Sequence, residues 1–390
     1  MAETPKIIQV QHFLEDRYHF RLNVVSNDIE VKKKGSDTYE IMNENTIIIQ
    51  MLRDGFKGID KDFKWLMRSD FVQQYDPFQE YFETLERWDG KTDHIKHLCS
   101  YITVKDPVWF TEMFKKHLVR VVACGLGAIP FNKHCFTFHG KQNDGKSYFV
   151  RHLSKPFSEY YTENIDFENK DGLIALCSNL IVNLDELAML SRTDINRAKT
   201  FFTADKIKIR RPYESKPVTA QRRASFFAST NDDEFLTDST GNVRWLIMKI
   251  DGINHDNGGA GGYGSVDINK VWSQAFHLFV GGYKYQLTRE EIERSENQNR
   301  EHFRSTPEID LLRHYFEPSN KTVNDNEFVT TTEILRRLQR VVGSELKLNH
   351  ISIGKALRFL GFEQQTGLDK NGMGIKGYYV KYFTMLNKNS

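Results

Sequence analysis

The stretch FTFHGKQNDGKSYFVRHLS, residues 136–154, decides the fold of this chain. Its centre fits G-x-x-x-x-G-K-[ST], in which backbone amides wrap phosphates, the lysine neutralises charge and the hydroxyl binds magnesium. The apolar residues before it predict a strand and those after it a helix, which is the context that such a loop needs. Taken alone, the pattern also fits a simple glycine turn. In this context we expect a phosphate-binding loop that uses Gly140, Asn143, Asp144, Gly145, Lys146, Ser147 and Tyr148.

Two further apolar runs end in polar residues suited to hydrolysis. LIVNLDEL, residues 180–187, places Asp185 to hold magnesium through its water shell and Glu186 to polarise an attacking water. SFFAST, residues 225–230, is followed by Asn231, which can orient that water and sense the γ-phosphate. The alternatives are that the two acids cap a helix and that the asparagine makes a turn.

An arginine stands between a glycine turn and the next apolar run. In FLTDSTGNVRWLIMKI, residues 235–250, Arg244 is either an ordinary surface residue or a finger that stabilises charge on a neighbouring subunit's nucleotide. The residues alone leave both readings open.

The fold class follows from the spacing of the apolar runs. CFTFHG, LIVNLDE, ASFFAST and WLIMKI are short, apolar on both faces and separated by helical stretches. Such runs are typical of a mostly parallel sheet covered by helices, so residues 105–287 are expected to form an α/β core. Asp76 with Pro77, and Asp106 with Pro107, each predict the start of a helix.

The flanking regions have different patterns. Residues 1–104 predict a small α+β lead-in, and residues 288–322 predict a charged helical linker. In residues 323–390, two helices and a hairpin give the pattern of a winged helix, with a capping box at Thr330 and Glu333 and a turn at Asn371 and Gly372.

The motifs together resemble the virulence-associated protein E family of phages and mobile elements. Its ATPase core is similar to the superfamily-three helicases of the AAA+ class. The order and spacing of the matching motifs agree over about residues 70–250. These motifs are YDPFQEYFETLERWDGK from Tyr75, GKQNDGKS from Gly140, LDE from Leu184, RRPY from Arg210, STND from Ser229 and LTDSTGNVRWL from Leu236.

The resemblance implies ATP and Mg²⁺ as cofactors, with Ser147 and Asp185 holding the metal ion. It implies Lys146, Glu186, Asn231 and Arg244 as the catalytic set. It also implies that Arg244 acts across a subunit boundary, so that the working form is a homo-oligomeric ring, expected to be a hexamer. The chain departs from the family in two places, with Val243 where a paired arginine is usual and Asn143 where glycine is frequent.

A basic segment lies between the acidic pair and Asn231. Residues 197–227 hold nine basic and two acidic residues, and in KIKIRR, residues 206–211, cations alternate with isoleucines as on the two faces of a strand. Such a strand either tracks a phosphate backbone or is a solvated edge. Superfamily-three helicases carry a DNA-contacting hairpin at this place, which favours single-stranded or forked DNA. The expected contacts are Lys206, Lys208, Arg210 and Arg211, with Lys355 and Arg358 of the winged helix as a second contact or a protein-binding surface.

Composition narrows the class of protein. The 390 residues are 39% hydrophobic and 13% aromatic, which excludes a disordered chain, and a net charge of +2 means that nucleic acid must be bound by local patches. Four scattered cysteines disfavour a disulfide framework. No apolar run fits a signal peptide or a membrane span, so we expect a cytoplasmic protein without a membrane partner.

Two further motifs are rejected. GAGGYG, residues 259–264, fits a dinucleotide fingerprint but does not directly follow a strand, so a surface loop is expected. Two clusters of histidine and cysteine, at residues 94–99 and 134–139, lack a second pair at ligand spacing, so no zinc is expected.

These features predict an ATP-hydrolysing DNA helicase or translocase of a phage or mobile element, acting in DNA replication. One alternative is an ATP-dependent DNA-binding initiator or defence ATPase that does not unwind. The other is a small-molecule kinase or nucleotidase built on the same loop.

Overall fold

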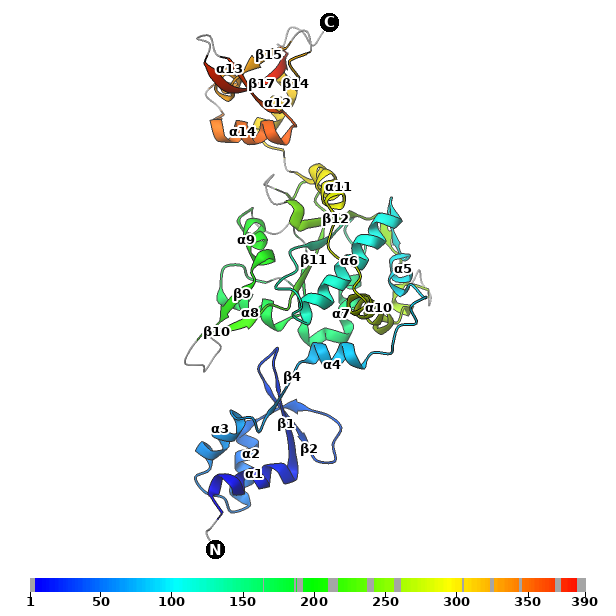
Figure 1. The fold of residues 1–390 in the computed structure, drawn as a ribbon, viewed down its shortest axis with the longest axis vertical. Coiled ribbons are helices and arrows are strands. Elements are labelled where there is room, and N and C mark those ends of the chain that lie inside the picture. The colour runs from blue at the N-terminus through cyan, green and yellow to red at the C-terminus, as the bar shows by residue number, and fades with distance from the viewer. Residues whose placement is uncertain are drawn as a thin grey trace. The chain divides into compact units, whose positions relative to one another are not determined.

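The structure, a computed structural model, describes residues 4–163, 165–185, 187, 192–209, 217–236, 242–255, 261–303, 305–322, 326–343, 346–368 and 373–383. The chain divides into two compact units (Figure 1). The first holds residues 1–231 and 243–295, and the second holds residues 232–242 and 296–390. Each unit is described by itself.

A five-stranded parallel sheet forms the centre of the first unit, as the apolar runs predict. Its strand order is β12-β6-β11-β8-β7, and every neighbouring pair is parallel. The loop after β6 therefore leaves an inner strand of the sheet, with β11 and β12 on either side. The strands are β6 (Cys135–His139), β7 (Tyr161–Glu163), β8 (Ile181–Leu184), β11 (Ser225–Thr230) and β12 (Trp245–Lys249).

Helices cover both faces of this sheet. Successive residues of β11 point to opposite sides, as a strand requires. The ring of Phe227 lies 6.4 Å from that of Phe114 in α6 (Pro107–Gly125), whereas the ring of Phe226 lies 4.7 Å from that of Phe202 in α9 (Arg192–Thr203). Aromatic rings from α6 and α9 thus pack on opposite faces of the sheet.

The two aspartate caps that the sequence predicts in this unit are present. Asp76 accepts from backbone amides at the start of α4 (Pro77–Thr84), and Asp106 does the same for α6. The remaining elements of residues 93–295 are α5 (His94–Cys99), β5 (Ile102–Thr103), α7 (Lys146–Ser154), η1 (Lys155–Tyr160), α8 (Lys170–Ser178), β9 (Lys206–Ile209), β10 (Val218–Gln221), η3 (Asn242–Arg244), β13 (Gly252–Ile253), η4 (Tyr263–Ser265) and α10 (Ile268–Val280). α11 (Arg289–Asn299) crosses the boundary between the units.

The N-terminal residues form a small α+β arrangement around their own apolar core. Its sheet has the order β3-β2-β1-β4, in which only the pair β1 and β4 is parallel. The first helix has no side-chain cap and was not predicted. The elements are α1 (Lys6–Arg17), β1 (Tyr18–Asn23), β2 (Ile29–Lys33), β3 (Glu40–Ile41), α2 (Glu44–Arg53), α3 (Asp60–Met67) and β4 (Gln73–Tyr75).

The second unit contains the expected two helices and hairpin, and it starts earlier than the sequence suggests. Its elements are η5 (Arg300–His302), α12 (Pro307–Tyr315), β14 (Phe316–Pro318), β15 (Glu327–Val329), α13 (Thr331–Val342), α14 (His350–Phe359), β16 (Gln364–Leu368) and β17 (Gly374–Tyr382). The predicted linker at 288–322 includes α12 and β14, which belong to this unit because Leu312 and Phe316 are buried in its core and β14 pairs with β17. The capping box at Thr330 and Glu333 is present. The predicted turn at residues 371–372 lies outside the described residues.

All four cysteines, which lie among the described residues, are buried and outside any disulfide. Among the described helices, none combines the length and the apolar character needed to cross a bilayer.

Candidate nucleotide-binding site

The loop after β6 has the backbone of a phosphate-binding turn. Asn143 and Gly145 both have a positive φ, of 65° and 77°, and α7 starts immediately afterwards at Lys146. The free backbone amides of the first turn of α7 are therefore next to the loop, where they favour an anion. Asparagine tolerates the left-handed region better than most residues, so Asn143 can maintain the turn.

Gly145 is required by packing as well as by its φ. A Cβ at this position would lie 1.5 Å from Nε2 of His255. The ring of His255 is fixed from both sides, because Nε2 lies 3.1 Å from the carbonyl oxygen of Asp144 and Nδ1 lies 3.1 Å from the hydroxyl of Tyr263. His255 thus supports the loop from behind, a role that the sequence patterns did not indicate.

Lys146 folds back over the loop. Its ammonium donates to the carbonyl oxygens of Gly140 at 2.9 Å and Lys141 at 2.5 Å. Burial lowers the pKa of Lys146 below its usual range. The ammonium is therefore held inside the turn by neutral acceptors, which an anionic phosphate can replace.

Ser147 and Asp185 meet at the carboxyl end of the sheet. Oγ of Ser147 donates to Oδ1 of Asp185 at 2.5 Å, and the hydroxyl of Ser229 in β11 donates to the same oxygen. Oxygen atoms from α7, from β11 and from the residue that follows β8 therefore meet at one point. Hydroxyl and carboxylate oxygens are the ligands that Mg²⁺ prefers, so this set fits the predicted magnesium site.

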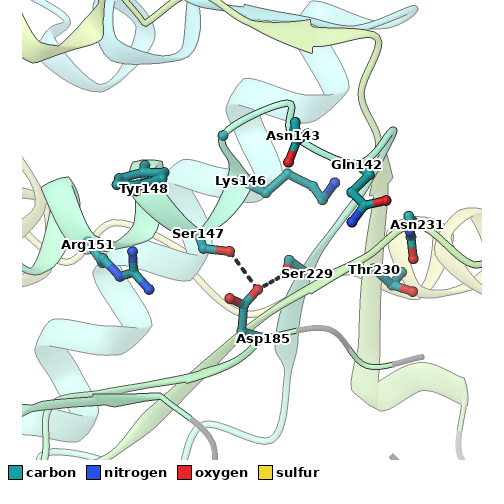
Figure 2. A pocket seen from close by; sticks show the side chains of 11 residues that line it. Gln142, Asn143, Lys146, Ser147, Tyr148, Arg151, Asp185, Ser229, Thr230 and Asn231 are labelled. Atoms are coloured by element: carbon teal, nitrogen blue, oxygen red, sulfur yellow. Dashed lines mark hydrogen bonds between the residues drawn. The ribbon is translucent and has the colours of Figure 1, made fainter. Parts of the chain in front are cut away.

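These residues line one cavity of about 220 Å³. Figure 2 shows Ser147 and Asp185 in its middle, Tyr148 and Arg151 on one side, and Gln142 and Asn231 on the other. Its lining is Gln142, Asn143, Gly145, Lys146, Ser147, Tyr148, Arg151, Asp185, Ser229, Thr230 and Asn231.

Most of the predicted nucleotide-binding residues contribute to that lining. Tyr148 is 65% exposed and presents a ring to the cavity, and Asn231 lies at its other side. Gly140 and Asp144 belong to the loop but not to the lining: a Cβ on Gly140 would meet Ile250 and Asp144 instead. Glu186 lies outside the described residues.

Arg151 is a cavity residue that the motif did not reveal. Its guanidinium makes two hydrogen bonds to Glu163, at 2.5 Å and 2.7 Å, and the hydroxyl of Tyr161 donates to the same carboxylate at 2.6 Å. These hydrogen bonds from Arg151 lower the pKa of Glu163. The signal was available in the sequence, because a residue four positions after Ser147 shares its helix face.

Arg244 lies at the amino ends of the parallel strands, whereas the loop follows the carboxyl end of β6. It immediately precedes β12, whose first residue, Trp245, pairs with Cys135 at the amino end of β6. The loop follows the other end of β6, beyond His139, so the length of the strand separates the two, at roughly 3.3 Å per residue. Arg244 is therefore not among the residues that line the cavity.

The basic segment forms the predicted hairpin strand. In β9, Ile207 is 3% exposed whereas Lys208 is exposed, and β9 pairs antiparallel with β10. The side chain of Lys206 is not described, and Arg210 and Arg211 lie outside the described residues. In the second unit, Lys355 and Arg358 are exposed on α14.

Two of the nine basic residues of this segment serve the fold instead. Arg222 is fully buried and donates to the carbonyl oxygens of Phe201 and Phe202 at the end of α9, at 2.7 Å and 2.8 Å. Arg223 is paired with Asp76 at 2.6 Å. Counting charges along the sequence therefore overstates the basic surface.

Three solved structures of the NrS-1 C-terminal region, all apo, are similar to this chain in fold. They are 14%, 12% and 13% identical to it, with TM-scores of 0.53, 0.51 and 0.52. They cover 96%, 97% and 97% of this chain, which in turn covers 99% of each. None of the curated proteins compared with it matches.

The virulence-associated protein E-like domain matches residues 82–304. This stretch contains the phosphate loop, all five strands of the parallel sheet and Arg244. It is more than half of the 390 residues. The sequence motifs had indicated this assignment, and the chain belongs to the virulence-associated protein E-like family.

Proposed function

We propose that this protein is an ATP-hydrolysing AAA+ motor that acts on DNA during the replication of a phage or mobile element. The observation that carries the proposal is the meeting of Ser147 and Asp185, 2.5 Å apart, beside a loop whose lysine is held by neutral acceptors. Nucleotide hydrolysis needs a phosphate loop, a carboxylate that holds the metal ion and a polar residue that orients water. The loop after β6, Asp185 after β8 and Asn231 after β11 are such groups.

The chain's own residues divide the work. Lys146 would leave the carbonyl oxygens of the loop for the phosphates of ATP, and Ser147 with Asp185 would hold Mg²⁺. A bound Mg²⁺ would neutralise charge that develops on the phosphates. Asn231, at the far side of the cavity, would orient the attacking water.

The position of Arg244 supports a site shared between subunits. Arg244 lies at the amino ends of the strands and is separated from the phosphate loop of its own chain by the length of β12. It can still reach the nucleotide of a neighbour in a ring, and a finger of this kind raises hydrolysis by roughly 10³ to 10⁵. We infer a homo-oligomeric ring, expected to be a hexamer.

The first test measures ATP hydrolysis with and without single-stranded DNA over a salt series. Single-stranded DNA should stimulate ATP hydrolysis by the wild-type protein at low salt. Lys146→Ala should not hydrolyse ATP. Absence of any DNA effect at low salt would contradict a motor and favour a small-molecule kinase. A forked duplex then shows whether strands separate, which distinguishes a helicase from an initiator that does not unwind.

The second test mixes two inactive variants. Lys146→Ala retains the arginine, and Arg244→Ala retains the phosphate loop, so a mixed ring would contain some complete sites. Activity should therefore return on mixing, whereas Arg53→Ala, an exposed arginine of α2, should stay active alone. Full activity of Arg244→Ala by itself would remove the case for a shared site.

A further inference from the structure

A second cation lies in the cavity besides Lys146. Arg151 is one helical turn after Ser147 on α7, and both residues line the cavity with Tyr148. The side chain of Arg151 is 44% exposed, and its guanidinium lies 5.1 Å from the ring of Tyr148. The guanidinium is thus open to a ligand that enters beside Tyr148 (Figure 2).

A carboxylate holds this guanidinium in the structure. Glu163, the last residue of β7, accepts both hydrogen bonds from Arg151 and a third from Tyr161. β7 pairs with β8 so that Glu163 lies opposite Asn183, two residues before Asp185. The negative charge of Asp185 acts on both Arg151 and Glu163.

The charges around the cavity are therefore satisfied internally. Lys146 is bound to loop carbonyls and Arg151 to Glu163, while Asp185 accepts from two hydroxyls. A nucleotide with several phosphate charges must compete with these partners for each cation. A guanidinium suits this exchange, because its planar fork forms paired hydrogen bonds equally well with carboxylate and phosphate.

We propose that Arg151 binds a phosphate group of the nucleotide and that Glu163 is a positioning residue, which competes with the phosphate for the guanidinium and gives it up when a nucleotide binds. This inference rests on the proposed nucleotide site and adds a regulated contact to it. Glu163 then opposes binding, because the pair must separate before Arg151 can turn to the phosphates. A pair that only fastens α7 to β7 would oppose nothing.

A double-mutant cycle separates these two roles. The full-length protein is titrated with a fluorescent, non-hydrolysable ATP analogue and Mg²⁺, using wild type, Arg151→Gln, Glu163→Gln and the double variant. Arg151→Gln should weaken binding about tenfold, the scale of a charge-assisted hydrogen bond to a phosphate. Glu163→Gln should tighten it about three- to fivefold, the scale of a partly exposed ion pair.

The decisive value is the effect of Glu163→Gln in the absence of the arginine. In the double variant the gain should vanish, so that its affinity equals that of Arg151→Gln. An equal gain in both backgrounds would overturn the inference, as would an unchanged affinity of Arg151→Gln. Arg151→Lys, which keeps the charge but not the fork, should recover part of the affinity, and this variant answers the question if Arg151→Gln does not fold.

A matched ion pair provides the control. Arg17 and Asp54 are 2.7 Å apart and 42% and 37% exposed, and neither lines the cavity. Arg17→Gln and Asp54→Asn should leave analogue affinity unchanged. If wild type binds no nucleotide, the proposed function itself fails; if wild type binds but the cycle shows no coupling, only the role of Arg151 and Glu163 fails.

Discussion

The hydroxyl of Ser147 and the carboxylate of Asp185 are joined by a hydrogen bond of 2.5 Å, although they are 38 positions apart in the chain. The bond connects the first turn of α7 to the carboxyl end of β8. Hydroxyl and carboxylate oxygens are both of the kind that Mg²⁺ prefers. Their separation in sequence and contact in space make this pair a direct test of the magnesium site.

Mg²⁺ should tighten the binding of the ATP analogue to the wild-type protein. In Ser147→Ala and in Asp185→Asn this effect of Mg²⁺ should be about 10- to 100-fold smaller, the range for groups that orient a metal. Without Mg²⁺, affinity should change little, since the phosphate loop remains. Titrations with Mg²⁺ and with a chelator measure both values. Ser229→Ala, which removes the second hydroxyl that donates to Asp185, should have a smaller effect. If all three variants keep the full response to Mg²⁺, the metal binds elsewhere.

Gly145→Ala should abolish nucleotide binding and lower the thermal midpoint. The added Cβ meets His255, and the left-handed backbone adds roughly 1–2 kcal/mol of strain for a residue with a Cβ. Shortening the obstructing side chain, in Gly145→Ala with His255→Ala, should restore part of the midpoint, because the clash is removed while the backbone strain and the loss of the two contacts of His255 remain. Thermal unfolding of the two single variants and the double variant checks this. If the midpoint of the double variant falls by the sum of the single losses, the clash is not the cause.

Lys208→Ala should weaken single-stranded DNA binding and make it less dependent on salt. The exposed lysine would neutralise one phosphate, so its removal should lower the magnitude of the slope of log K against log salt by about 0.7. Anisotropy titrations of a labelled oligonucleotide at several salt concentrations give the slope. Lys155→Ala, an exposed lysine outside β9, is the control. Equal slopes for Lys208→Ala and wild type would place the DNA elsewhere.

The sequence predicted which elements form the site, and in which order, better than it predicted the contacts between their side chains. Strand, loop, helix and the acid after β8 follow from local patterns, because apolar runs and glycine spacing are properties of neighbouring residues. The support of the loop by His255 could not be predicted, since it joins residues 111 positions apart through a backbone carbonyl. Local charge was also misleading: Arg222 is counted among the nine basic residues of its segment, yet it is buried and donates to the carbonyl oxygens at the end of α9.

The domain boundary was difficult to predict for a related reason. Residues 288–305 are highly charged, which is typical of a linker, and the predicted linker extends to residue 322. α12 mixes apolar with charged residues, and Ile309, Leu312 and Tyr315 fall on one side and are buried. A short amphipathic helix next to a charged one is visible only when its partner, the sheet of β14 and β17, is known.

Acid should destabilise the first unit through buried histidines. His117 is fully buried in α6, its ring centroid 4.7 Å from that of Phe227, and burial together with the charge of Arg120 lowers its pKa well below the usual 6.5. The folded protein therefore keeps His117 neutral, while the unfolded chain binds a proton below about pH 6.5. The free energy of unfolding should then fall by up to about 1.4 kcal/mol per pH unit per such histidine as the pH drops below that value.

Urea unfolding at pH 7.5 and 5.5 measures this loss, and the comparison of variants assigns it. His117→Gln should be less stable than wild type at both values, because it disturbs the core, but it should lose about 1 kcal/mol less between them. His19→Gln, which changes an exposed histidine of β1, should retain the full loss. The difference between the two pH values is the decisive quantity, since it is independent of the packing cost of the substitution. An identical loss in His117→Gln and wild type would mean that His117 takes up its proton in the folded state.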